Sequence, residues 1–207
     1  MKTNVYVDGF NLYYGAVKNT PYRWLDLRAL SQCILPENTI QRIRYFTALV
    51  DPRPDDPRQR QRQETYIRAL RTIQGLEVHY GTFLKSRTRM ALAQPPPGGP
   101  RTVEVIKTEE KGSDVNLATY LLLDAFEGDY EAALIISNDS DLAEPIRIVR
   151  QRFKRRVVVA CPYRRCAMEL QRVASLVKYI RRSALKRSQL PPVLTDAHGT
   201  IKKPPEW

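Results

Sequence analysis

The chain has 207 residues, of which 43% are hydrophobic, and its 34 Lys and Arg against 22 Asp and Glu give a formal net charge of +12. The length suits one domain with a well-formed core, and the composition is that of a soluble globular protein. An odd count of three cysteines, with only two histidines, argues against both a disulfide scaffold and a structural zinc site.

The distribution of apolar residues argues against membrane insertion and secretion. No apolar stretch reaches the length that spans a membrane, and the N-terminus carries no secretory signal. We therefore expect a cytoplasmic protein with no membrane partner. The excess of basic charge attracts phosphate backbones, although it also fits a merely basic soluble protein.

The first 85 residues are predicted to alternate strands and helices, because short apolar runs are separated by segments with helical spacing. Gly75 is placed to end a helix that begins after a proline-rich turn. From the N-terminus, the expected elements are a strand at 4–7, helices at 10–17 and about 25–34, a strand at 41–50, an arginine-rich helix ending near 73, and a strand at 76–85.

A protruding hairpin is expected at about residues 85–108. The segment 94–100, Gln-Pro-Pro-Pro-Gly-Gly-Pro, cannot form regular structure and reads as a loop tip. The flanking segments 87–90 and 102–106 look like the two arms. Such an arm can embrace a nucleic-acid strand or serve as an oligomerisation arm in a homo-oligomer, and the sequence leaves both open.

The remaining elements complete an α/β pattern. A helix is predicted at 113–126, with Ser113 as its N-cap and Val115, Ala118, Leu122 and Phe126 at helical spacing. A strand at 132–137, a helix at 142–153, a strand at 156–160, a helix at 166–176 and a strand at 177–180 follow. This alternation predicts one α/β domain over 1–182 with a mainly parallel sheet.

Residues 183–207 are rich in proline and lack periodicity. We interpret them as a C-terminal tail, either disordered or held to the surface by Leu194, Ile201 and Trp207.

Four carboxylates stand where strands end or helices begin: Asp8, Asp114, Asp139 and Asp141. In an open α/β sheet, functional residues gather beyond the carboxyl ends of the strands, near the point where strand order reverses. Clustered carboxylates repel one another, and a hard divalent cation relieves that repulsion. Oxygen ligands without thiol or imidazole suit Mg²⁺ or Mn²⁺ rather than zinc, and such an ion activates water for attack on a phosphodiester.

Each acid also has an ordinary structural explanation. Asp8 and Gly9 can form a simple turn, and Asp114 in a first helical turn interacts favourably with the helix dipole. Asp139 or Ser140 can be an N-cap. For any one acid the ordinary explanation is favoured, and only their joint placement on one rim of the sheet favours a site.

Three sequence strings resemble the NYN domain, a branch of the PIN-like metal-dependent ribonucleases, and within it the bacterial LabA-like group. They are Val7-Asp-Gly-Phe-Asn-Leu12, Lys111-Gly-Ser-Asp-Val115 and Ser137-Asn-Asp-Ser-Asp-Leu142, and the resemblance extends over about residues 1–180. Two positions depart from the family pattern: Asn138 stands where glycine is common, and Leu142 where phenylalanine is frequent. We expect the turn to survive because asparagine tolerates positive φ.

The resemblance implies a PIN-like, Rossmann-like fold with a mostly parallel central sheet and helices on both faces. It implies a catalytic metal site at the four aspartates, with Asn11 orienting a ligand or the phosphate and Ser137 supporting the site by hydrogen bonding. The metal would be Mg²⁺ or Mn²⁺, and the substrate RNA, in single-stranded form.

Basic side chains near the motifs are expected to contact the phosphate backbone of the RNA. Lys111 precedes Asp114 by three residues, and Arg87, Arg89 and Lys107 would line the hairpin near it. Such contacts position a strand without reading its sequence.

The sequence therefore predicts a metal-dependent endoribonuclease. Three alternatives stay open: an RNA-binding module with weak or absent catalysis, a phosphatase or nucleotide hydrolase of another α/β class, and a regulatory protein that binds partners through hairpin and tail.

Overall fold

The computed structural model describes residues 1–207 and is built on a six-stranded parallel sheet. The sheet has the order β3-β2-β1-β6-β7-β8, so strand order reverses between β1 and β6. The strands are β1 (Lys2–Asp8), β2 (Thr39–Thr47), β3 (Leu76–Tyr80), β6 (Ala132–Ile136), β7 (Arg156–Cys161) and β8 (Leu176–Tyr179). This confirms the predicted α/β fold with a mostly parallel central sheet.

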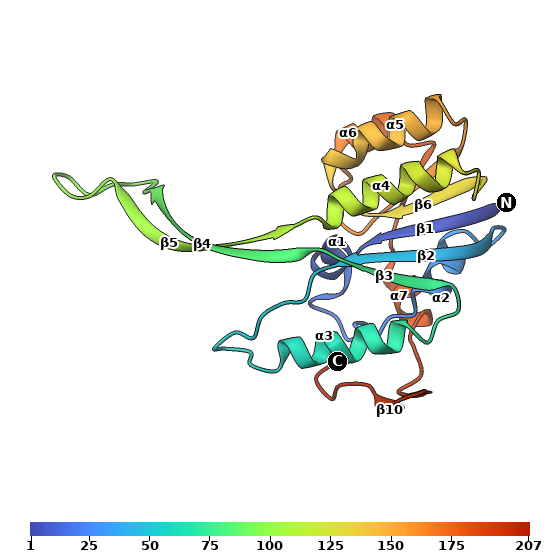
Figure 1. The fold of residues 1–207 in the computed structure, drawn as a ribbon, viewed down its shortest axis with the longest axis horizontal. Coiled ribbons are helices and arrows are strands. Elements are labelled where there is room, and N and C mark those ends of the chain that lie inside the picture. The colour runs from blue at the N-terminus through green and yellow to red at the C-terminus, as the bar shows by residue number, and fades with distance from the viewer.

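Helices cover both faces of the sheet (Figure 1). On one face lie α4 (Ser113–Phe126), α5 (Ala143–Gln151) and α6 (Met168–Val173). On the other lie α2 (Leu27–Ile34), α3 (Gln59–Leu70) and α7 (Arg182–Arg187). None of the helices combines the length and the apolar character that crossing a membrane requires.

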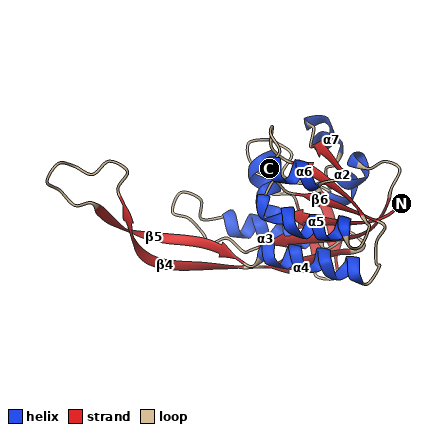
Figure 2. Ribbon diagram, turned by 90° about the horizontal axis from the view of Figure 1, so that it is seen from above, coloured by secondary structure: helices blue, strands red, loops and turns tan.

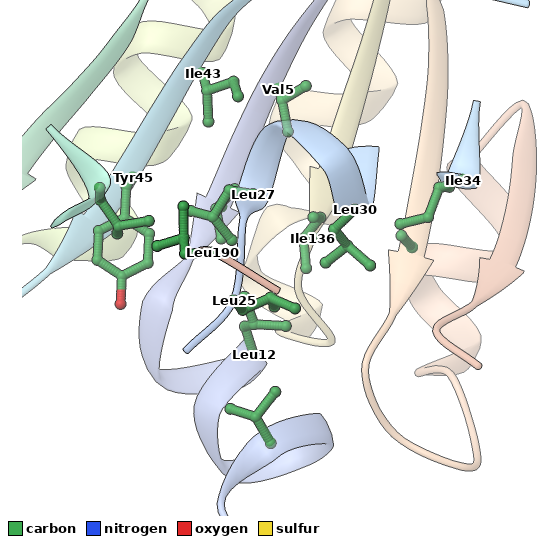
Figure 3. Close-up of a cluster of buried hydrophobic side chains, with 14 of the residues drawn as sticks. Val5, Leu12, Leu25, Leu27, Leu30, Ile34, Ile43, Tyr45, Ile136 and Leu190 are labelled. Atoms are coloured by element: carbon green, nitrogen blue, oxygen red, sulfur yellow. The ribbon is translucent and has the colours of Figure 1, made fainter. Parts of the chain in front are cut away.

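Alternating side chains of the central strands supply two separate apolar cores. In β1, Val5 and Val7 pack with α2 and α3, whereas Tyr6 packs with α4 on the opposite face. Figure 3 shows the first of these clusters, with Val5 and Ile136 of the sheet facing Leu27 and Leu30 of α2. Both faces of β1 and β6 are therefore buried, which explains the continuous apolar sequence of β6, Ala-Ala-Leu-Ile-Ile.

The hairpin projects far from the body of the molecule (Figures 1 and 2). Its strands are β4 (Thr82–Ala91) and β5 (Thr102–Lys111), which pair antiparallel along their full length. The single strand predicted at 76–85 is therefore wrong: the chain leaves the sheet at Gly81 and continues into the hairpin. The apolar alternation runs across this junction, so periodicity alone did not indicate the break.

Several predicted elements differ from the structure at their ends. The helix predicted at 10–17 is a short α1 (Gly9–Leu12) followed by a π-helical turn at Tyr13–Val17. The helix predicted at 142–153 starts with a 3-10 turn at Ser140–Leu142, and the one predicted at 166–176 is the shorter α6.

The long helix α4 is present with the predicted bounds, but its buried face and its cap differ from the prediction. Leu117 and Leu121 are buried, whereas Val115 and Phe126 are largely exposed. Apolar residues lie on more than one side of this helix, so periodicity did not select the core face. Gly112, with a φ of 97°, occupies the N-cap position that was assigned to Ser113.

Residues beyond 182 fold back onto the body of the protein. After α7, the short hairpin of β9 (Val193–Asp196) and β10 (Gly199–Lys202) lies against α3, where Arg68 forms a bidentate ion pair with Asp196. Ile201 is buried, and the Trp207 ring lies 5.6 Å from the Tyr66 ring. These residues therefore contribute to the same core as the central sheet.

A buried ion pair ties β2 to α4 beneath the sheet. The Arg44 guanidinium donates to both carboxylate oxygens of Asp124, each at 2.9 Å, and both residues are buried. The Tyr6 hydroxyl donates to the same carboxylate at 2.6 Å. Because every group in this cluster has a partner, its burial is tolerated, but loss of one partner would leave a buried charge without compensation.

We expect Asp124→Asn to lower the free energy of unfolding by about 3–5 kcal/mol, because it removes the charge that compensates Arg44. Urea denaturation followed by circular dichroism measures this change. The control is Glu127→Gln, an exposed acid just after the same helix, which should stay within about 0.5 kcal/mol of the wild type. Equal stabilities of the two variants would contradict the assigned role of the pair.

Candidate active site at the switch point of the sheet

Asp8 occupies the carboxyl end of β1, next to the point where strand order reverses. It caps α1, because its Oδ1 accepts a hydrogen bond from the Asn11 backbone N–H at 2.9 Å. Gly9 allows the backbone to pass close to β2, because a Cβ at this position would lie 2.7 Å from the Tyr45 hydroxyl and 2.8 Å from the Phe46 carbonyl oxygen. The turn at Asp8 and Gly9 therefore brings the chain back over the end of β2.

Hydrogen bonds hold the Asp8 carboxylate in one orientation. Its Oδ2 accepts from the Asn11 amide at 2.6 Å and from the Ser137 hydroxyl at 2.8 Å. The Ser137 hydroxyl also accepts from the Asp139 backbone N–H at 3.1 Å. The structure thus brings together the first and the third of the sequence strings, which are about 130 residues apart.

Asn138 joins this arrangement with a negative φ, so the turn forms without the positive φ that asparagine tolerates. Instead its backbone N–H donates to the Asn11 side-chain oxygen at 3.2 Å, and its own side-chain oxygen accepts from the Ala167 N–H at 2.8 Å. Asn138 therefore ties the loop after β6 to the loop after β7.

Asp139 and Asp141 follow β6 in the loop that leads to α5. The Asp139 side chain accepts from the Asp141 backbone N–H at 3.0 Å and so caps the short 3-10 turn. The capping role predicted for Asp139 is thus correct. The same residue also lies close enough to Asp8 and Asp114 to act on their charges. Asp141 is exposed and stands farther toward solvent.

Asp114 reaches the same cleft from the first turn of α4. The cleft has a volume of about 560 Å³, and its walls include Asp8, Asn11, Glu110 and Asp114. Glu110, from the end of β5, was missed by the sequence reasoning. Its carboxylate accepts from the Ser113 hydroxyl at 2.7 Å and from the Ser113 backbone N–H at 3.2 Å. Its position three residues before Ser113, at the start of a helix, could have indicated that Glu110 lies close to the first turn of α4.

The carboxylates repel one another across this cleft. Burial and, after it, the negative charges of Asp8, Asp139, Glu110 and Asp141 together raise the pKa of Asp114 to about 7. Burial also raises the pKa of Asp8, although hydrogen bonds from Asn11 and Ser137 oppose that rise. All the charged groups that shift the pKa of Asp114 are acids, so the cleft concentrates negative charge within a basic protein.

The site fits a hard divalent cation in charge and in ligand type. Its donors are carboxylate oxygens, which Mg²⁺ and Mn²⁺ prefer. In the structure, however, no three His, Cys, Asp or Glu side chains are close enough to hold one ion between them. Mg²⁺ usually retains several waters and takes one or two protein carboxylates, so water-mediated ligation is compatible with this spacing.

The predicted phosphate-binding residues are spread along the hairpin. Lys111 lies at its base, paired with Thr82 in the strand ladder, whereas Arg87 and Arg89 lie farther out, at roughly 3.3 Å per residue about 15–25 Å from that base. Lys107 and Lys111 both pair with Glu109, at 2.6 and 3.7 Å. None of the four lines the cleft, whose basic wall residues are Arg53 and Lys85; Lys111 lies at the base of the hairpin, and the others lie along a path leading away from it.

The raised pKa of Asp114 predicts a pH-dependent gain in stability for Asp114→Asn. A folded-state pKa near 7, above the usual 3.8, means that ionised Asp114 destabilises the fold at pH 8 and that this cost fades as pH falls from 7 toward 4. We expect the variant to exceed the wild type by about 1–3 kcal/mol at pH 8, allowing for solvent screening, and to match it near pH 4.

Urea unfolding at several pH values, without divalent ions, measures the difference. Asp55→Asn changes an exposed loop carboxylate and should follow the wild type throughout. A stability difference between Asp114→Asn and the wild type that does not vary with pH would contradict the proposed repulsion.

Comparison with known proteins identifies the family to which the chain belongs. The family model of the NYN domain matches residues 2–181. The 6-hydroxy-3-succinoylpyridine 3-monooxygenase of Pseudomonas putida is 30% identical over 237 aligned residues, which cover all of this chain and 75% of the relative. A structure of a protein of unknown function from Vibrio parahaemolyticus has a TM-score of 0.55 and 18% identity, covering 87% of this chain and 93% of that chain, and so shares the fold. The chain therefore belongs to the NYN domain family, within the PIN-like superfamily, as the three strings predicted.

Proposed function

We propose that the protein is an endoribonuclease that uses Mg²⁺ or Mn²⁺ to hydrolyse RNA phosphodiesters. The observation that carries this proposal is the group of mutually repelling carboxylates, without a basic partner, at the switch point of a sheet whose family is ribonuclease-like. The residues that would hold the ion, directly or through water, are Asp8, Asp114, Asp139 and Asp141. When bound, such an ion supplies Lewis-acid stabilisation of charge on the phosphate and lowers the pKa of water.

Asn11 and Ser137 act in this proposal by orienting Asp8. The Asn11 amide donates to Asp8 while its oxygen accepts from the Asn138 backbone, so both polar ends of the side chain are engaged within the protein. Ser137 likewise bridges Asp8 and the Asp139 backbone. We therefore assign both residues to positioning of the acids rather than to direct contact with the phosphate.

The hairpin offers a route for the RNA strand toward the cleft. Lys111 stands at its base next to Asp114, and Arg87 and Arg89 add exposed positive charge farther out. Because these are phosphate contacts, binding through them should weaken with salt and read little sequence.

We expect purified protein with Mn²⁺ to cleave labelled single-stranded RNA, and Asp139→Asn to reduce the cleavage rate at least 100-fold. Mn²⁺ should also raise the melting temperature of the wild type, because an ion that binds only the folded state stabilises it. The rise should be smaller in Asp139→Asn and unchanged in the exposed control Asp55→Asn, which should also keep the wild-type cleavage rate. The thermal measurement tests the ion site separately from catalysis.

Cleavage that Asp139→Asn leaves intact would contradict the assigned site. RNA binding without cleavage, equal in the wild type and in Asp139→Asn, would favour the RNA-binding module instead.

A second candidate activity is oxygenation of an aromatic substrate. The observation that favours it is the 30% identity, over the whole chain, to a protein named a 6-hydroxy-3-succinoylpyridine 3-monooxygenase. A monooxygenase inserts one atom of O₂ into its substrate and reduces the other to water with two electrons from a donor. Hydrolysis of RNA needs neither O₂ nor a donor, so the two candidates differ in their requirements.

We expect no O₂ consumption above background when the protein is given NADH and 6-hydroxy-3-succinoylpyridine, while RNA cleavage continues at the same rate in an anaerobic chamber. An oxygen electrode and product chromatography measure the first result. Substrate-dependent O₂ consumption with a hydroxylated product, and no RNA cleavage, would establish the second candidate and overturn the first.

A further inference from the structure

A second cavity lies beside the acidic cleft, on the α3 face of the sheet. It has a volume of about 120 Å³, and its walls come from α1, β2, α3 and the C-terminal Trp207. It shares Phe10, Tyr14 and Arg53 with the acidic cleft, so the two sites have a common wall. Asp8 and Asp114, which line the acidic cleft, do not line this cavity, and neither do Asp139 and Asp141.

Aromatic rings form the inner walls of this cavity. The Tyr66 ring lies edge-on to Tyr45, with centroids 6.5 Å apart, and to Trp207, at 5.6 Å. The Tyr66 hydroxyl donates to the Leu25 carbonyl at 2.8 Å, which fixes the ring and uses its polar end. Tyr13 lines the same cavity. Such walls offer flat apolar surfaces to a planar guest.

The cavity also carries an excess of positive charge. Arg23, Arg53 and Arg62 line it, together with a single carboxylate, Asp56. Arg62 forms an ion pair with Asp56 and also lies 3.9 Å from Glu206, so its charge is compensated.

The other two arginines keep donors that are free for a ligand. Arg23 lines the cavity, and its Nε makes no hydrogen bond within the protein. A guanidinium with unpaired donors can bind an anion that lies beside it. Arg53 is exposed at the rim of the cavity. Asp56 forms its ion pair with Arg62, which lowers the pKa of Asp56 most, and Arg53 lowers that pKa only through its charge. The cavity therefore combines an apolar interior with two cations available to an anion.

We propose that this cavity binds a single aromatic ring that carries an anionic group. The ring lies among Tyr13, Tyr66 and Trp207, and the anion is held by Arg23 and Arg53. The size is of the order of a single ring, because an apolar cavity of about 150 Å³ binds benzene. The site goes beyond the proposed ribonuclease activity, since its walls and charges do not depend on the acidic cleft.

Two sources can supply this chemistry: a pyrimidine nucleotide and a free aromatic carboxylate. Both present one ring and one anion, so the walls and the arginines suit both. The shared wall at Phe10 and Tyr14 would bring either ligand next to the acidic cleft.

Titration of the full chain with uridine 5′-monophosphate and, separately, with nicotinate tests the proposal. Calorimetry gives the affinity, and the quenching of tryptophan fluorescence that is lost in Trp207→Leu, which keeps Trp24, reports on Trp207. We expect saturable one-to-one binding of at least one of the two probes. The uncharged counterparts, uridine and nicotinamide, should bind at least fivefold more weakly, and adenosine 5′-monophosphate, with its fused rings, should bind more weakly than the uridine nucleotide.

Variants locate the binding in this cavity. Arg53→Gln, at an exposed position that does not endanger the fold, should weaken binding at least fivefold, and Trp207→Leu should weaken it by removing one wall. The matched control Arg152→Gln removes the same charge from an exposed position outside the cavity and should bind like the wild type.

The outcome separates the two sources and is independent of catalysis. Binding of the nucleotide alone assigns a nucleotide site, binding of nicotinate alone assigns a site for a free aromatic acid, and either result supports the proposal. Binding of neither probe, or binding that Arg53→Gln and Trp207→Leu leave unchanged, would overturn it. Asp139→Asn should bind as the wild type does without divalent ions, so a failure of RNA cleavage leaves this result unaffected.

Discussion

The contact between Asp8 and Ser137 is the interaction around which the acidic cleft is built. It joins the carboxyl ends of β1 and β6, the two strands between which the order of the sheet reverses. Asp8 is only 3% exposed, and its oxygens are held by Asn11 and Ser137. Ionisation of a carboxylate that is so buried costs free energy. Hydrogen bonds to the carboxylate reduce this cost, and the neighbouring acids increase it. The orientation of Asp139 depends on the same hydroxyl, so loss of Ser137 would disturb two acids together.

Repulsion among the acids is tolerated because the rest of the fold is anchored elsewhere. Two apolar cores enclose the central strands, and the buried pair of Arg44 and Asp124 fixes α4 against the sheet. The first turn of α4 is therefore held in place although Asp114 faces other negative charges there. Natural proteins commonly concentrate unfavourable contacts at functional positions and offset them in the surrounding structure.

Much of the fold and part of the site could be predicted from the sequence. Alternating apolar runs identified the sheet, and three short strings identified the family and placed Asp8, Asp114 and Asp139 near one another. The membership of the LabA-like group stays a prediction. The sequence did not predict the break at Gly81, because apolar alternation continues through it, or the exposed side of α4, because that helix is apolar on several sides. Glu110, the pair of Arg44 and Asp124, and the aromatic cavity depend on contacts between distant segments, which local patterns do not encode.

The hairpin gives the molecule a mechanical property, because both of its strands enter the body at the acidic cleft. Asp114 stands three residues after Lys111 at its base, and the Phe83 ring contacts Phe10 of α1, with centroids 5.7 Å apart. An isolated two-stranded ribbon is only marginally stable in water, so the distal part bends easily. The ribbon is therefore anchored at one end only, by the contact of Phe83 with Phe10 and by the passage of β5 into α4, and both anchors border the acidic cleft.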